Sequence, residues 1–291
     1  MKIYLTALTH VGKVREINED SVAICCDLTR QRWFESDGYI PLSAAGALAV
    51  VADGMGGANA GEVASNLAIE QIRNCFMDKE LPVNTSDSKK CEFLKKAITQ
   101  AGSAILTHVE TDPETIGMGT TIVVLWIEKC RAHVAWCGDS RCYVFNPDKG
   151  LSPLTKDHSY VQELVDKGEL RPDQMIGHPD SNIITRGLGD IDTDSTAEAL
   201  TFPITEGDIF LLCSDGLCGY CNDTTIEKII YKHINNLSKC SLKLLESALK
   251  TGGYDNISIA ILATLPDSTK RNINTLSFIH HFISSLVHFN H

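Results

Sequence analysis

Four short polar strings, far apart in the chain, each contain an aspartate beside an apolar run. Asp53 follows the apolar residues 47–52, and Asp215 comes just after residues 209–213; the other two strings contain Asp20 and Asp255. Each run predicts a buried strand that ends and hands a carboxylate to a turn. Magnesium and manganese prefer oxygen ligands and keep several waters. The sequence therefore predicts a site at which the fold gathers distant carboxylates around hard cations.

Composition and charge bound the class of protein. The chain has 291 residues with 43% hydrophobic content, enough to bury the core of one large domain or two small ones. Its net charge is 26 − 37 = −11, and it has no run rich in lysine or arginine, so no nucleic-acid partner is expected. Residues 1–10 alternate like a strand rather than like a signal peptide, and no stretch approaches the roughly 20 apolar residues of a membrane span. Eleven cysteines without secretory features predict free thiols in the cytoplasm, and we expect a monomer.

The order of predicted elements indicates an α+β fold. Strands are expected within residues 1–26 (broken by a polar turn at 12–20) and at 47–52, 120–127, 131–137, 141–145, 208–213 and 256–263, and helices at 60–78, 91–109, 159–167 and 224–249. Residues 28–44 are irregular, with a turn at Asp37-Gly38. Because strands and helices do not alternate regularly, we expect packed, mostly antiparallel sheets with helices on the outer faces. The long irregular stretch 168–194 is typical of a functional or disordered segment.

Eight motifs follow one another in a recognisable order. They are Arg15-x-x-Asn18-Glu19-Asp20, Asp53-Gly54-Met55-Gly56-Gly57, Gly117-Met118-Gly119-Thr120-Thr121, Gly138-Asp139-Ser140-Arg141, Asp157-His158-Ser159, Ile184-Thr185-Arg186-Gly187-Leu188-Gly189, Ser214-Asp215-Gly216-Leu217 and Asp255-Asn256. A single Asp-Gly is common turn chemistry. The ordered set, from about residue 4 to about residue 264, resembles the bacterial branch of the metal-dependent protein phosphatases, the PPM or type 2C family.

The resemblance implies a four-layer αββα sandwich with two Mg²⁺ or Mn²⁺ ions at one end. By analogy Asp53 bridges both metals, the carbonyl of Gly54 ligates one, and Asp215 and Asp255 complete the other. Asp139 matches the position that holds a third, weaker metal in bacterial members. A phosphomonoester dianion enters such an acidic pocket only if metals invert the local charge, which fits this ligand set.

The remaining site residues are assigned through the same resemblance. Glu19 and Asp20 would act mainly through metal-bound waters, Asn256 would support the site, and Arg15 would hold the substrate phosphate with its planar fork. The implied reaction is hydrolysis of phosphoserine and phosphothreonine in proteins phosphorylated by a serine/threonine kinase. A metal-bridging hydroxide attacks phosphorus in line, without a phospho-enzyme intermediate, and the catalytic residues are Arg15, Asp53 and Asp215.

The position of Met55 leaves the proton-transfer step of the mechanism open. Many eukaryotic members carry a histidine after the Asp-Gly, where this chain has Met55, which cannot transfer a proton. The general acid is therefore unassigned, and His158 is more typical of a structural histidine in a loop.

Residues 168–194 match the flap of bacterial members, with His178, Asn182 and Arg186 as its recognisable residues. They are expected to influence substrate selection, although Arg186 is also a candidate to anchor the base of the flap.

Cysteine chemistry offers two competing interpretations. Cys26 and Arg32 have the spacing of cysteine-dependent phosphatases, but no glycine lies between them to form a phosphate loop, so packing of Cys26 is expected. Cys218 and Cys221 have the spacing of a redox or metal pair without the context that either needs. We expect two packed thiols there, with oxidative inactivation as the alternative.

A phosphoprotein-binding scaffold that lacks catalysis is the alternative function, although every expected metal position is filled. The predicted phosphatase domain covers residues 1–266, followed by a linker and tail at 267–291. The tail has helical spacing at Leu276, Ile279, Ile283, Leu286 and Val287. It is expected to dock on the domain or fray, and the alternative is that it docks a partner.

Overall fold

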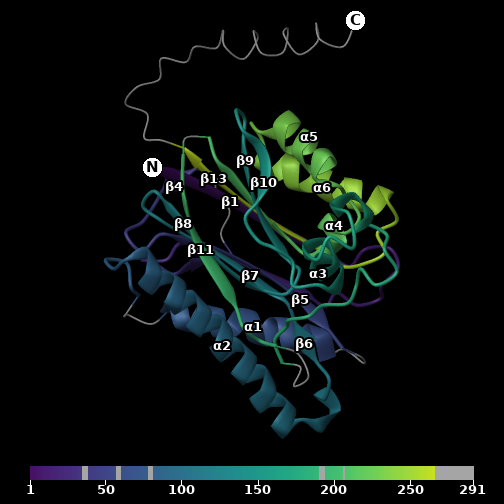
Figure 1. Ribbon diagram of the computed structural model, residues 1–291. Coiled ribbons are helices and arrows are strands. Elements are labelled where there is room, and N and C mark those ends of the chain that lie inside the picture. The colour runs from purple at the N-terminus through teal and green to yellow at the C-terminus, as the bar shows by residue number, and fades with distance from the viewer. Residues whose placement is uncertain (35–38, 57–59, 78–80, 190–193, 206, 266–291) are drawn as a thin grey trace, which may run out of the picture.

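Two antiparallel sheets pack face to face at the centre of the computed structural model, which describes residues 1–34, 39–56, 60–77, 81–189, 194–205 and 207–265 (Figure 1). In spatial order, one sheet contains β10 (Gly150–Pro153), β9 (Arg141–Asn146), β12 (Ile209–Cys213), β13 (Ile257–Leu265), β1 (Lys2–His10) and β4 (Ile40–Pro41). The other contains β11 (Glu198–Pro203), β8 (Arg131–Cys137), β7 (Ile122–Glu128), β5 (Ala47–Met55), β2 (Asp20–Asp27) and β3 (Arg32–Trp33), while β6 (Gly119–Thr120) pairs with β5. The predicted Asp37-Gly38 turn, Gly57 and the tail lie outside the described residues.

Helices cover both outer faces. In Figure 1, α1 (Ala60–Met77) and α2 (Asp87–Thr111) lie below the sheet that contains β5, and α5 (Asp223–His233) and α6 (Leu237–Lys250) lie on the far side of the other sheet. The short helices α3 (Tyr160–Asp166), α4 (Asp215–Cys218), η1 (Pro113–Thr115) and η2 (Pro172–Gln174) belong to connections. The expected four-layer αββα sandwich is confirmed. No described helix is long and apolar enough to cross a membrane.

Three apolar layers hold the four structural layers together, and β5 contributes to two of them. Leu48, Val50 and Ala52 pack toward α1 and α2, whereas Ala49 and Val51 pack between the sheets. Successive side chains of a strand point to opposite faces, so a strand buried on both sides is a continuous apolar run. This explains why the run was readable as a strand from sequence.

Several elements differ from the sequence-based expectation. The strand β5 continues to Met55, so Asp53 lies within a strand and not in the turn after it. The expected helix 224–249 is two helices, because the side chain of Asn236 accepts a hydrogen bond from the backbone N–H of Lys239 and starts α6. Ser86 caps α2 in the same way, so this helix begins at Asp87, four residues before the expected start. The edge strand β11 was not predicted, since its half-buried residues carry no alternating pattern.

Candidate active site

The alternation that fills the layer between the sheets also places carboxylates at its end. Ile24 and Cys26 of β2 face that layer, as do Ala49 and Val51 of β5. Counting in steps of two along each strand puts Asp20 and Asp53 on the same inner face. The two residues pair directly across β2 and β5. Two carboxylates thus meet where the apolar layer stops.

Asp20 is held by the opposite sheet. The hydroxyl of Ser214 donates to Asp20 Oδ2 at 2.7 Å and accepts a hydrogen bond from the backbone N–H of Ser258 at 2.9 Å. Asp20 is buried, and its Oδ1 has no hydrogen-bond partner among the described residues. The pKa of Asp20 is raised to about 7, mainly by desolvation. Hydrogen bonds from the hydroxyls of Ser214 and Ser258 oppose this shift, and the charges of Asp215 and Asp255 add to it. An orphaned, buried carboxylate oxygen is a natural cation ligand.

Asp53 and Asp215 approach each other from different sheets. Ser214 ends β12 and Asp215 opens α4, whose residue Gly216 lies so close to the carbonyl of Asn256 that a Cβ there would clash. Desolvation first and then Asp255 raise the pKa of Asp215 to about 6. Desolvation, followed by the charges of Asp20 and Asp215, raises the pKa of Asp53 well above its ordinary value. The pKa shifts reflect one crowded set of negative charges.

Asn256 connects the loop after β1 to the start of β13. Its Nδ2 donates to the carbonyls of Val11 and Ile17, both at 2.9 Å, and its Oδ1 accepts from the backbone N–H of Glu19 at 2.7 Å. These bonds hold Glu19 beside the site, where desolvation raises the pKa of its carboxyl. Asn256 therefore supports the loop that carries Arg15 and Glu19.

Arg15 reaches back across the site entrance. Its Nη2 donates to Asp255 Oδ2 at 2.9 Å, and its side chain is 52% exposed. The hydrogen bond and charge of Asp255 raise the pKa of Arg15. The guanidinium, expected to hold phosphate, is thus paired with a predicted metal ligand, while half of its surface faces solvent.

Gly54 is required by close packing. A Cβ at this position would meet the carbonyl oxygens of Gly61, at the start of α1, and of Glu19. Its backbone N–H donates to the Glu19 carbonyl at 3.2 Å. Only glycine lets β5 pass so close to the first turn of α1 beside the carboxylates.

Asp139 comes from the turn between β8 and β9. Gly138 there has φ of +113°, and a Cβ would strike the side chain of Thr121. Thr121 also bonds Ser140 through their hydroxyls at 2.8 Å. Asp139 is buried, and desolvation, Asp215 and Asp157 raise the pKa of its carboxyl well above the ordinary value. Threonine and glycine therefore fix the turn that presents Asp139.

A cavity of about 220 Å³ unites most of the predicted site. The predicted residues that line it are Arg15, Glu19, Asp53, Gly54, Asp139, Asn182, Asp215 and Asp255. Asp20 and Asn256 lie behind this wall, bonded as described. Of the charged residues lining the cavity in the described part of the chain, Arg15 is the one cation.

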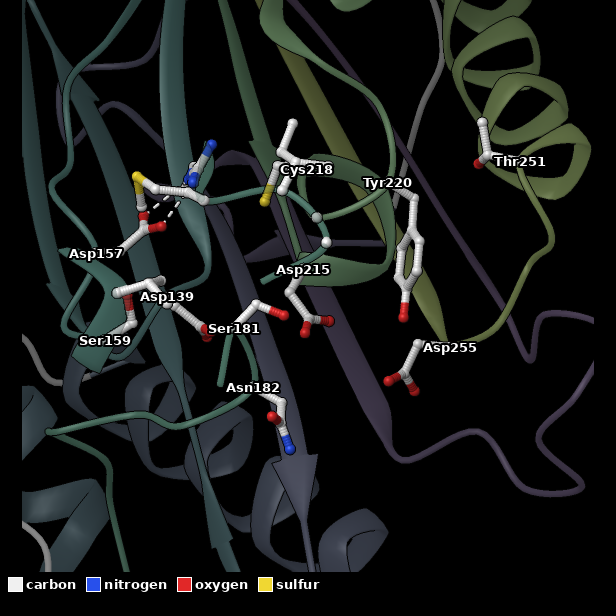
Figure 2. A pocket seen from close by; sticks show the side chains of 16 residues that line it. Asp139, Asp157, Ser159, Ser181, Asn182, Asp215, Cys218, Tyr220, Thr251 and Asp255 are labelled. Carbon is white, nitrogen blue, oxygen red and sulfur yellow. Dashed lines mark hydrogen bonds and ion pairs between the residues drawn. The ribbon is translucent and has the colours of Figure 1, made fainter. Parts of the chain in front are cut away.

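A second cavity of about 280 Å³ adjoins the first and shares Asp139, Asn182, Asp215 and Asp255 with it. In Figure 2, Ser181 and Asn182 of the flap lie below Asp215, Asp139 projects toward Ser181, and Tyr220 projects toward Asp255. Arg141 pairs with Asp157 through Nε and Nη2 at 2.8 and 2.6 Å. Figure 2 draws these bonds as dashed lines.

The three flap residues take different positions. Asn182 lines both cavities. Arg186 pairs with Glu198 at 3.0 Å and with Asp194 at 3.4 Å, which anchors the base of the flap on β11. His178 accepts a hydrogen bond from the backbone N–H of Asp180 within its own loop at 3.2 Å. Among described residues lining the two cavities, neither His178 nor Arg186 occurs. Residues 190–193 of the flap lie outside the described part.

His158 supports the turn that carries Asp139. Its ring Nδ1 accepts from the backbone N–H of Gly138 at 3.1 Å, and the ring stacks on Trp136 with centroids 6.0 Å apart. Burial and then the charge of Arg186 lower the pKa of His158, although Glu198 opposes them. The residue is a buried structural histidine in this arrangement.

The donor set suits hard divalent cations. No three His, Cys, Asp or Glu side chains of the described residues converge closely enough to hold a metal by themselves. Water and backbone carbonyls must therefore complete a coordination shell, which is how Mg²⁺ and Mn²⁺ are commonly bound. The carboxylates are desolvated and have raised pKa values, and Arg15 is the one cationic side chain among the described residues that line the cavity. A divalent cation would therefore be strongly attracted to the site.

Sequence reasoning did not single out Ser214, Thr121 or Tyr220. Ser214 positions Asp20, and the Thr121 hydroxyl accepts from the backbone N–H of Asp53 at 3.3 Å. Ser214 lies two residues after Leu212, and Thr121 lies two residues before Val123. Since Leu212 and Val123 face the layer between the sheets, the alternation of side chains along a strand could have indicated that Ser214 and Thr121 point to the same side. Tyr220 had no signal, since a turn alone brings it to the cavity.

The cysteine-based alternatives lose their basis. Cys26 is buried in β2, and its Sγ donates weakly to the carbonyl of Arg32 at 3.6 Å. Cys218 and Cys221 are buried, and all eleven cysteines are free. The geometry provides neither a phosphate loop around Cys26 nor an exposed thiol pair at Cys218.

Comparison with known proteins identifies the family. The family model described as protein phosphatase 2C matches residues 37–251, more than half of the chain. The serine/threonine phosphatase stp of Listeria welshimeri is 31% identical over 254 residues, which cover 87% of this chain and 93% of that protein. The crystal structure of the Mycobacterium tuberculosis phosphatase PstP/Ppp is 32% identical, covers 91% of this chain and 100% of its own, and has a TM-score of 0.75. The PstP catalytic domain in complex with two manganese ions is 30% identical, covers 91% and 99%, and has a TM-score of 0.72.

Proposed function

The chain belongs to the protein phosphatase 2C family and is a protein serine/threonine phosphatase, and we propose that the gathered carboxylates perform its reaction with bound Mg²⁺ or Mn²⁺. The observation that carries this proposal is the desolvated cluster of Asp20, Asp53, Asp139 and Asp215, whose carboxyl pKa values are all raised. The two manganese ions bound by the PstP catalytic domain support it.

The proposed ligands come from both sheets. Two ions would be held by Asp53, the Gly54 carbonyl, Asp215 and Asp255, with Asp20 participating, and Asp139 would serve a third. Glu19 would act through water, and Asn256 keeps its loop in place. Cations bound there would supply positive charge and would lower the pKa of a nearby water, the chemistry that hydrolysis of a phosphate ester needs.

The chain's own side chains bind and orient the phosphate. Arg15 is half-exposed beside Asp255, so its free N–H groups can donate to phosphate oxygens while the ion pair keeps the guanidinium at the cavity. Met55 lines the same cavity but has no transferable proton. The proton for the leaving oxygen must come from water or from another residue. Asn182 of the flap lines the cavity and would contact the substrate. Arg186 and His178 would shape the flap instead.

The proposal extends to organisation and partners. We take residues 1–266 as the catalytic domain, acting as a cytoplasmic monomer on proteins phosphorylated by a serine/threonine kinase, and residues 267–291 as a separate tail. The eleven free thiols are compatible with a reducing compartment.

The test is Mn²⁺-dependent hydrolysis of p-nitrophenyl phosphate and of a phosphothreonine peptide. Asp53→Ala and Asp215→Ala should nearly abolish turnover, while Asp148→Asn, in an exposed turn, should not change it. Near-wild-type rates in either site variant would contradict the assignment. Tight phosphoprotein binding by a folded, metal-loaded protein without turnover would favour the scaffold instead.

A further inference from the structure

Two tyrosines from separate loops pack together at the rim of the site. The rings of Tyr220, after α4, and Tyr254, before Asp255, have centroids 5.7 Å apart with planes at 38°. Tyr220 lines the 280 Å³ cavity, and Tyr254 is 54% exposed. Exposed aromatic rings that extend a cavity are typical of recognition surfaces.

Glycine makes the position of Tyr254 possible. Gly252 has φ of +133°, and a Cβ there would collide with the Tyr254 ring. The ring of Tyr254 therefore lies close against the backbone of its own loop at Gly252. The backbone N–H of Lys13 donates to the carbonyl of Gly253 at 2.7 Å, which ties this loop to the loop after β1.

The carboxylates that line the second cavity are in ion pairs or are proposed metal ligands. Asp157 forms two bonds to Arg141, and Asp255 pairs with Arg15. Asp139 and Asp215 are proposed metal ligands. With metals bound as proposed, the described residues of the wall therefore leave no carboxylate free to bind a cationic side chain of the substrate.

The rest of the wall combines apolar and polar side chains, and its polar members, Ser159, Ser181, Asn182 and Thr251, are uncharged. Its apolar members include the buried Val161 and Cys218, together with Met175 and Ile176 of the flap and Tyr220, and Ile176 is 50% exposed. An apolar side chain entering this space would remove these surfaces from water, which is the favourable term for such a contact.

We propose that Tyr220, Tyr254 and the adjoining cavity bind an aliphatic or aromatic side chain next to the phosphorylated residue of the substrate. This inference rests on the proposed function, because the cavity shares Asp139, Asp215 and Asp255 with the metal site. Phosphate and neighbouring side chain thus occupy the two connected cavities at once.

Phosphothreonine peptides of one length, with Leu, Ala, Arg or Asp flanking the phosphorylated residue, test this. With Mn²⁺, the wild-type protein should hydrolyse the Leu peptide with kcat/KM about tenfold above the Ala peptide. Tyr220→Ala and Tyr254→Ala should reduce that preference to about twofold or less by raising KM, since they remove the apolar surface. Tyr254→Phe should keep it, because the ring face remains.

Tyr231→Ala, a half-exposed tyrosine on α5, is the matched control and should retain the preference. Equal rates for the Leu and Ala peptides in the wild type, or a preference for the Arg peptide that the two variants abolish, would overturn the inference. Turnover of p-nitrophenyl phosphate distinguishes a failure of the proposed function from a failure of the inference about the side chain. If the wild type lacks it, the proposed function fails; if every variant keeps it and no Leu preference exists, only the inference about the side chain fails.

Discussion

Asp20 and Asp53 lie directly opposite each other in the antiparallel pair of β2 and β5, with no cationic side chain between them in the described structure. Like charges at opposed positions destabilise a sheet. Desolvation raises the pKa of both carboxyls. The charge of Asp20 raises the pKa of Asp53 further, and the charges of Asp215 and Asp255 raise that of Asp20. The metal-free protein is therefore destabilised at a site that cations would neutralise.

Asp53→Asn should therefore separate stability from activity. Removing one buried charge should raise the Tm of the metal-free protein by roughly 3 °C, because repulsion with Asp20 and Asp215 is relieved. The same variant should lose the Tm increase that Mn²⁺ causes, and turnover should fall by about 10³-fold. Thermal unfolding with EDTA or Mn²⁺ measures both effects, with Asp148→Asn as control. A lower metal-free Tm would contradict the electrostatic account.

Arg15→Ala should affect substrate and metal in opposite directions. Loss of the guanidinium should raise KM for p-nitrophenyl phosphate about tenfold, since a charge-assisted hydrogen bond is lost. Asp255 would lose its 2.9 Å partner and become a stronger cation ligand, so half-maximal activation should need less Mn²⁺. Steady-state kinetics over a Mn²⁺ titration measures both. An unchanged KM would restrict Arg15 to neutralising Asp255.

His133 should make stability fall on acidification. Burial first, and then the charge of Lys90, lower its pKa from 6.5 to about 4 in the folded state. The unfolded chain thus takes up the proton first, and stability is lost progressively as pH falls from 6.5 toward 4. The loss should be roughly 2 kcal/mol at pH 5. Urea unfolding at pH 7 and 5 should show a smaller decrease for His133→Phe, which keeps the ring beside Trp126 but cannot bind a proton. Equal decreases would exclude His133 as the cause.

Thiol reactivity should follow exposure. Cys130 is exposed, whereas Cys218 and Cys221 are buried. A hydrogen bond with Cys213 and then burial raise the pKa of the Cys218 thiol, and burial raises the pKa of the Cys221 thiol. Thiolates are the reactive form, so iodoacetamide or peroxide should modify Cys130 well before the other two, and activity should persist. Peptide mass spectrometry with Mn²⁺ present identifies the modified residues. Early modification of Cys218 together with inactivation would revive the redox interpretation.

Deletion of residues 268–291 should leave turnover of p-nitrophenyl phosphate unchanged. Leu265 pairs with Lys2 at one end of β13, while Ile257 pairs with His10 at the end nearest Asp255. The two ends of this nine-residue strand lie roughly 26 Å apart. Leu265, the last described residue, is therefore far from Asp255 and the site. A folded truncation without activity, judged by its Tm, would show that the tail contributes to the site.

The sequence by itself determined the family, the sandwich class and the identity of the carboxylates, because doubly buried strands are continuous apolar runs and the ordered motifs interrupt them at recognisable residues. It did not determine which groups complete the site. Ser214 reaches Asp20 from another sheet, Arg15 pairs with Asp255 across 240 positions, and Tyr220 meets Tyr254 through two unrelated turns. Such contacts depend on how the sheets pack and the loops close, and local periodicity carries no record of either. Only the tertiary structure decided them.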